Sequence, residues 1–174
     1  MSFAFELHFD EQTEAAVRSA WANLAAQGCD TSRNGVAPHV TLAIASAFDE
    51  SSLGPKLAAF TATHPPLPVT FGSVESFPSG VLYLAPIATP ALKAIHRDFH
   101  ARFRPFPSAR NSHYYTPGQW VPHCTLAMSV PATGLVDDTL RFDPPLPPSG
   151  WLRRLRVVEY PALKMHFDCP LGRS

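Results

Sequence analysis

The stretch Pro38-His39-Val40-Thr41-Leu42-Ala43 recurs in the second half of the chain as Pro122-His123-Cys124-Thr125-Leu126-Ala127. Pro, His, Thr, Leu and Ala keep the same order in both copies. Successive side chains of a β-strand point to opposite faces, so each histidine shares one face with the threonine two residues later. The residues between and after them are apolar and form the other face. The pattern predicts two strands that each bury an apolar back and present an imidazole and a hydroxyl in front.

The repetition decides between a structural and a functional interpretation of these histidines. A single His-x-Thr pattern in a strand is more often a half-buried histidine beside a hydroxyl group than a catalytic pair. A duplication that retains polar residues as well as apolar ones indicates a functional site. We therefore predict one site with two halves, made by His39, Thr41, His123 and Thr125.

Length, charge and cysteine content narrow the class of protein. The 174 residues suit one domain with a substantial core, and 14 basic residues balance 14 acidic ones. A neutral chain of this kind argues against wholesale binding to duplex DNA or to an anionic membrane. Three cysteines without a C-x-x-C pair indicate neither a disulfide framework nor a zinc knuckle. We expect a monomer in the cytoplasm, with no membrane partner.

The order of predicted elements repeats along the chain. The strands are predicted over 3–9, the first motif, 69–77, 81–86, the second motif, 151–160 and 163–168, and the helices from Asp10 to Gly28, from Ser51 or Ser52 to Thr61, and from Pro90 onward with Thr89 as its cap. A strand, a helix and a His-x-Thr strand therefore occur twice in this order.

These two His-hydrophobic-Thr-hydrophobic motifs, each preceded by proline and about half the chain apart, resemble those of the 2H phosphoesterase superfamily. This superfamily includes the bacterial 2′-5′ RNA ligase-like proteins and the cyclic nucleotide phosphodiesterases. The resemblance implies a mixed α/β (α+β) fold of two pseudo-symmetric lobes, with two antiparallel sheets flanking a central cleft and helices outside. It also implies a single 2H phosphoesterase-like domain over 1–174, with an internal repeat at roughly 3–48 and 80–131.

The resemblance implies a chemistry that the residue types also suit. Members open 2′,3′-cyclic phosphates or related cyclic esters, and some cleave or join 2′-5′ linked RNA, without a metal or other cofactor. The implied partner is a nucleotide or an RNA terminus. Two imidazoles can act as base and acid on opposite sides of phosphorus, and Thr41 and Thr125 can donate hydrogen bonds to its non-bridging oxygens. From relatives that make a 2′-phosphate, we assign His123 as the base and His39 as the acid. Relatives often carry arginine where this chain has Val121, so one phosphate contact is missing or comes from elsewhere.

Three functions stay open at this point. Hydrolysis of a cyclic phosphate is the first, and 2′-5′ RNA ligation or 2′-5′ phosphodiester cleavage at the same site is the nearest enzymatic alternative. A binding module for nucleotides or RNA that performs no turnover is the third. The presence of all four polar side chains of the two motifs argues against the third function.

Several residues near the second motif are candidates for substrate binding. Tyr114, Tyr115 and Trp120 lie just before this motif, where an aromatic ring can stack on a nucleobase, although loop packing explains them as well. Arg110 and His113 in the same loop can contact phosphate, or can be solvated loop residues.

Further candidates come from strands and from one helix. By alternation, Glu6, His8 and Tyr83 face the open side of their strands and can line the cleft. His96 and His100 have the four-residue spacing of a metal-binding helix, but no third ligand is evident, so we expect no metal site and an exposed helix flank.

Overall fold

The computed structural model describes residues 1–31, 36–103, 112–128, 145–146 and 149–172. Its elements are β1 (Ser2–Phe9), α1 (Glu11–Ala26), β2 (His39–Ala45), α2 (Glu50–Thr61), β3 (Leu67–Ser76), β4 (Leu82–Pro86), α3 (Pro90–Arg102), the 3₁₀ helix η1 (Ser112–Tyr115), β5 (Cys124–Ala127), β6 (Ser149–Tyr160) and β7 (Lys164–Pro170). The predicted helices and strands are all present in the predicted order, with bounds that differ by one or two residues in most cases.

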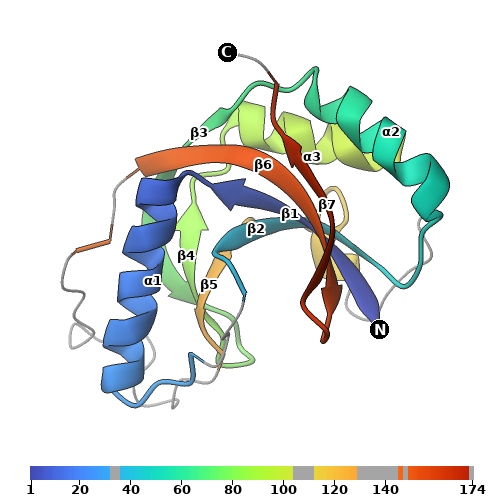
Figure 1. Ribbon diagram of the computed structural model, residues 1–174. Helices are drawn as coiled ribbons and strands as arrows, with labels where there is room; N and C mark the ends of the chain where they lie inside the picture. The colour runs from blue at the N-terminus through green and yellow to red at the C-terminus, as the bar shows by residue number, and fades with distance from the viewer. Residues whose placement is uncertain (32–35, 104–111, 129–144, 147–148, 173–174) are drawn as a thin grey trace.

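The described strands pair in the order β2-β1-β6-β3-β4-β5, and β7 pairs with the later part of β6 (Figure 1). Each of these pairs is antiparallel. The long strand β3 joins the two expected sheets, because its first part, from Leu67, pairs with β6 and its second part, from Phe71, pairs with β4. Although β2 and β5 stand at opposite ends of this order, they contact each other. The curvature of the sheet therefore brings the two motif strands together.

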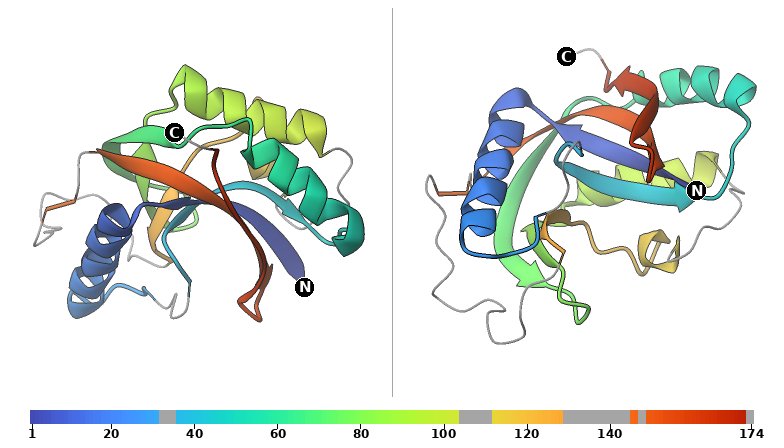
Figure 2. Two further views of the ribbon diagram at one scale, coloured as in Figure 1. Left: turned by 45° about the horizontal axis from the view of Figure 1, so that its top comes forward. Right: turned by 60° about the horizontal axis from the view of Figure 1, so that its bottom comes forward.

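Helices α1 and α3 each pack against strands from the other half of the chain. α1 follows β1 but packs against β5 and β6, whereas α3 follows β4 and packs against β2 and β3 (Figures 1 and 2). Both helices begin where the sequence predicts, because Asp10 accepts a hydrogen bond from the amide of Thr13 and Thr89 accepts one from that of Leu92. No helix in the described part of the chain is long and apolar enough to cross a membrane.

The start of α2 corrects one prediction. The capping residue is Asp49, whose side chain accepts a hydrogen bond from the amide of Ser51, and the helix begins at Glu50. Ser51 and Ser52 therefore lie inside the first turn and do not cap the helix. Aspartate is the stronger cap here because its carboxylate also interacts favourably with the positive end of the helix dipole.

Candidate active site

The two motif histidines have their rings anchored in the same way. Nδ1 of His39 lies 2.8 Å from the carbonyl oxygen of Ala37, and Nδ1 of His123 lies 2.8 Å from that of Val121. A carbonyl oxygen only accepts hydrogen bonds, so in both rings Nδ1 carries the hydrogen and donates it. The carbonyl two residues earlier thus fixes each ring, and Nε2 becomes the nitrogen that gains or loses a proton.

Two tryptophans tie the motif backbones to the opposite halves of the chain. Trp120, just before the second motif, donates its indole N–H to the carbonyl oxygen of Thr41 in the first motif at 2.9 Å. Trp21 of α1, before the first motif, donates to the carbonyl oxygen of Thr125 in the second motif at 3.1 Å. These reciprocal bonds hold β2 and β5 in their mutual position. In the sequence Trp21 belongs to the apolar stripe of a helix, and no local signal shows its distant partner.

A cleft of about 420 Å³ opens beside the second motif. His123, Thr125, Tyr114 and Tyr115 are among its lining residues, together with Met128 and the β3–β4 turn residues Phe77, Pro78, Ser79 and Val81. Tyr114 is 55% exposed, so its ring is accessible to a ligand. The two tyrosines are therefore placed where stacking on a base was predicted, and that role stays a prediction. No sequence signal singled out Phe77, whose ring lies 5.1 Å from that of His123.

Three strand residues predicted to face the cleft are buried. Glu6, His8 and Tyr83 are exposed by only 1%, 2% and 4% respectively. The hydroxyl of Tyr83 donates to Glu75 at 3.0 Å, and Nε2 of His8 lies 3.0 Å from Oε2 of Glu6. Alternation predicted the correct face of these strands but could not reveal what covers it, which depends on distant parts of the chain.

Glu6 lies beside the first motif histidine. Its Oε1 accepts a hydrogen bond from the hydroxyl of Tyr160 at 2.7 Å and lies 3.4 Å from Nε2 of His39. Burial alone raises the pKa of the Glu6 carboxyl, but the charge of His39 and the hydrogen bond from His8 outweigh it and lower this pKa overall. An ionised, buried carboxylate from β1 therefore lies beside the histidine of the first motif.

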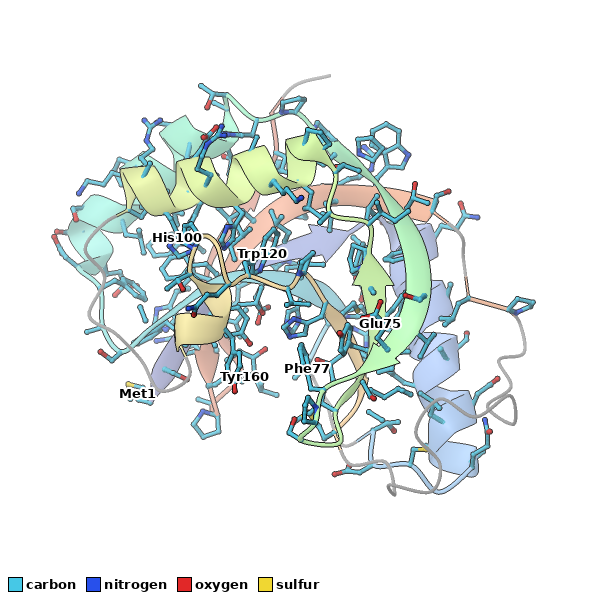
Figure 3. The ribbon with its side chains drawn as sticks, turned by 180° about the vertical axis from the view of Figure 1, so that it is seen from behind. Met1, Glu75, Phe77, His100, Trp120 and Tyr160 are labelled. Atoms are coloured by element: carbon cyan, nitrogen blue, oxygen red, sulfur yellow. The ribbon has the colours of Figure 1, made fainter. Side chains whose placement is uncertain are left out.

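Trp120 forms a structural cluster with two histidines of α3, His96 and His100. Figure 3 labels Trp120 and His100. The rings of Trp120 and His96 are stacked with centroids 3.9 Å apart, so one face of the indole is already covered. Nε2 of His96 bonds the carbonyl oxygen of Tyr115 at 2.8 Å, and Nε2 of His100 bonds that of Leu42 at 3.0 Å. The predicted exposed flank is therefore wrong for His96, which is 3% exposed and whose pKa burial lowers to about 4.

Two residues predicted to contact phosphate cannot be compared with the structure. Arg110 and the side chain of His113 lie outside the described residues. Within the described ranges, no three His, Cys, Asp or Glu side chains are grouped so that they could hold a metal ion.

Comparisons with known proteins agree with this geometry. Residues 9–162 match the family model of the 2′-5′ RNA ligase superfamily, and no curated protein sequence matches the chain. Similar solved structures include TT0787 of Thermus thermophilus, with 17% identity, a TM-score of 0.55 and both chains covered in full. E. coli LigT has 13% identity and a TM-score of 0.59, with 99% of this chain and 95% of LigT covered. Kluyveromyces marxianus Usb1 has 18% identity and a TM-score of 0.53, with 99% and 97% covered. The family model spans most of the chain, which confirms the resemblance of the two motifs: the protein belongs to the 2′-5′ RNA ligase superfamily of 2H phosphoesterases.

Proposed function

We propose that this protein hydrolyses a 2′,3′-cyclic phosphate, or a related cyclic phosphodiester, of a nucleotide or RNA end by two-histidine acid–base catalysis. The proposal rests mainly on one observation: His39 and His123 are anchored in the same way. In each ring Nδ1 donates a hydrogen bond to the carbonyl oxygen two residues earlier, and a threonine follows two residues later. Two rings held in this way can each exchange a proton through Nε2.

The proposed reaction proceeds with His123 as base and His39 as acid. His123 takes a proton from water while the water oxygen forms a bond to phosphorus. The bond between phosphorus and one ribose oxygen breaks, and the departing oxygen receives the Nε2 proton of His39. Thr41 and Thr125 stabilise the charge on the non-bridging oxygens. The product is an acyclic phosphate monoester, and the two imidazoles supply both proton transfers, so the scheme needs no metal ion or cofactor.

The cleft beside His123 suits a nucleoside as the rest of the substrate. Tyr114 and Tyr115 offer aromatic faces on which a base can stack without a sequence requirement. E. coli LigT, which shares the fold, has been solved in complex with 3′-AMP and with ATP. We therefore place the base of the substrate in this cleft and its phosphate between the two motifs.

The test is hydrolysis of a 2′,3′-cyclic mononucleotide in the presence of EDTA, with the product identified by phosphorus NMR. We expect turnover by the wild type and a loss in kcat of about a hundredfold to ten-thousandfold in His39→Ala and in His123→Ala. His64→Ala is the matched control, because this histidine packs against Phe60 at the end of α2, and its replacement should leave the rate unchanged. Full activity in either motif variant contradicts the mechanism, and activity lost to EDTA contradicts metal independence.

Cleavage or formation of a 2′-5′ phosphodiester linkage is the second candidate, favoured by the family that the chain matches. A 2′-5′ linked dinucleotide assayed in parallel separates the two. Turnover of this dinucleotide with no turnover of the cyclic mononucleotide would replace the first proposal. Binding of both compounds to the cleft without turnover of either indicates a binding module.

A further inference from the structure

The two motifs have the same anchoring but different neighbours at a matched position. Glu6 of β1 pairs with Thr41 of the first motif, and Tyr83 of β4 pairs with Thr125 of the second motif. Each side chain lies next to the histidine of its own motif. The first histidine thus faces a carboxyl group where the second faces a phenol.

The carboxylate of Glu6 contacts His8 as well as His39. The guanidinium of Arg156 lies 3.4 Å from Nδ1 of His8, and since arginine only donates, Nδ1 accepts and Nε2 carries the ring hydrogen. His8 donates this hydrogen to Oε2 of Glu6 at 3.0 Å, whereas Oε1 of Glu6 is the oxygen that faces His39. Arg156 is the register partner of Glu6 on β6 and also forms an ion pair with Asp168 of β7 at 3.3 Å, which balances its charge.

The phenol of Tyr83 is neutral. Burial and the neighbouring carboxylate of Glu75 raise the pKa of Tyr83 to about 12. The ring centroid of Tyr83 lies 5.7 Å from that of His123. Glu75 itself is exposed, and its two oxygens accept from the hydroxyls of Tyr83 and Ser73. The carboxylate beside Tyr83 is therefore hydrogen-bonded and exposed to water.

We propose that Glu6 is a positioning residue that keeps His39 protonated as the general acid, with a negative charge that the neutral Tyr83 does not supply at the matched position beside His123. A buried negative charge beside Nε2 favours the imidazolium form, and it acts more strongly than an exposed charge because water does not screen it. The roles of acid and base rest on the proposed function. The order in which the rings of His39 and His123 lose their protons does not depend on any substrate.

Within the described part of the chain, charged or titratable groups around these rings come from several strands and η1. Around His39 they are Glu6 and His8 of β1 and Arg156 and Tyr160 of β6, with Asp168 of β7 behind Arg156. Around His123 they are Tyr83 of β4, Tyr115 of η1 and, behind Tyr83, Glu75 of β3. Of these groups, Glu6 is the buried carboxylate that touches a motif histidine.

The first test follows the protonation of both rings by NMR, without any substrate. The imidazole signals of the wild type are recorded against pH and assigned with His39→Gln and His123→Gln. We expect the titration midpoint of His39 to lie above that of His123, and Glu6→Gln to lower the midpoint of His39 alone. Glu75→Gln, which removes the matched carboxylate of the other half, should leave His39 unchanged.

The second test measures the pH dependence of cyclic phosphate hydrolysis. Glu6→Gln should move the alkaline limb of the kcat profile to lower pH and reduce kcat at pH 8 by about tenfold or more, with KM nearly unchanged. Glu6→Asp, which retains the charge, should recover part of this loss. A purely structural role would reduce the amount of active protein but would not move the limb.

The outcomes separate this inference from the proposed function. If His39 titrates below His123 in the wild type, or if Glu6→Gln leaves its midpoint in place, the inference is overturned whatever the activity. If the NMR shift occurs but no cyclic phosphate is hydrolysed, the proposed function fails while the role of Glu6 stands. Because the wild-type order is itself decisive, the test does not depend on whether Glu6→Gln folds.

Discussion

At the residue scale, two tryptophan side chains connect the two halves of the protein through indole hydrogen bonds. Trp21 and Trp120 each reach the carbonyl oxygen of the threonine in the more distant motif, Thr125 and Thr41 respectively. A backbone carbonyl buried beside an apolar core needs a donor, and the loss of that donor leaves the oxygen unsatisfied. Each tryptophan therefore stabilises the fold and the relative position of the two motifs at once.

Trp21→Phe should lower the free energy of unfolding by about 1–3 kcal/mol, because it removes the donor to the carbonyl oxygen of Thr125 and retains most of the apolar ring. Urea denaturation measured by circular dichroism checks this loss. Trp151→Phe is the matched control, since Trp151 is 44% exposed and should be near neutral. Equal midpoints for the two variants would contradict the importance of the cross-connection.

At the scale of elements, the start of α1 is joined to the start of β6. The side chain of Asp10 accepts hydrogen bonds from the amide and hydroxyl of Thr13 and from the amide of Trp151. The amide of Asp10 in turn donates to the carbonyl oxygen of Trp151. The cap that the sequence predicts for a helix is therefore also the connection of this helix to the sheet.

This junction requires a residue without a side chain at Gly150. A Cβ atom there would collide with the side chain of Thr13, whose hydroxyl donates to Asp10 and cannot move away without losing this hydrogen bond. Gly150→Ala should therefore destabilise the protein by about 1–3 kcal/mol in thermal or urea unfolding. Gly72→Ala is the control, because its Cβ would meet the exposed side chain of Ile87 at 3.3 Å, which can rotate away. The expectation is wrong if the two alanine variants are equally stable.

At the scale of the whole molecule, the sequence predicts features that depend on neighbouring residues and misses contacts between residues far apart in the chain. The two motifs, their strands and the caps at Asp10 and Thr89 follow from alternation and from side chains a few residues apart. The burial of Glu6 depends on Tyr160, and the burial of His96 on Tyr115 and Trp120, so no window of sequence contains both partners. The joining of the two sheets through β3 is likewise a pairing of distant segments.

The response of the whole fold to acid should depend on His96. Its pKa of about 4 lies below the ordinary value of 6.5, so between these values the unfolded chain binds a proton that the folded chain excludes. The contribution of neutral His96 to stability is thus complete above pH 6.5 and is lost as the pH falls toward 4, by about 2 to 3 kcal/mol in all. Burial is the main cause, since protonation would place a charge between α3 and η1, where His96 is stacked on Trp120.

His96→Gln tests this dependence, because glutamine retains a donor for the carbonyl oxygen of Tyr115 but does not titrate. Unfolding free energies from urea titrations at several pH values between 4 and 7 should fall less steeply in this variant than in the wild type. His64→Gln replaces a histidine outside this cluster. In this variant the unfolding free energy should retain the pH dependence that His96 contributes in the wild type. The absolute stability of His96→Gln will be lower at every pH, because the ring stacked on Trp120 is lost, so the slope and not the level is decisive. Parallel curves for the wild type and His96→Gln would show that the acid response of the fold arises elsewhere, among carboxylates such as Glu6 and Asp168 whose pKa values are lowered in the folded chain.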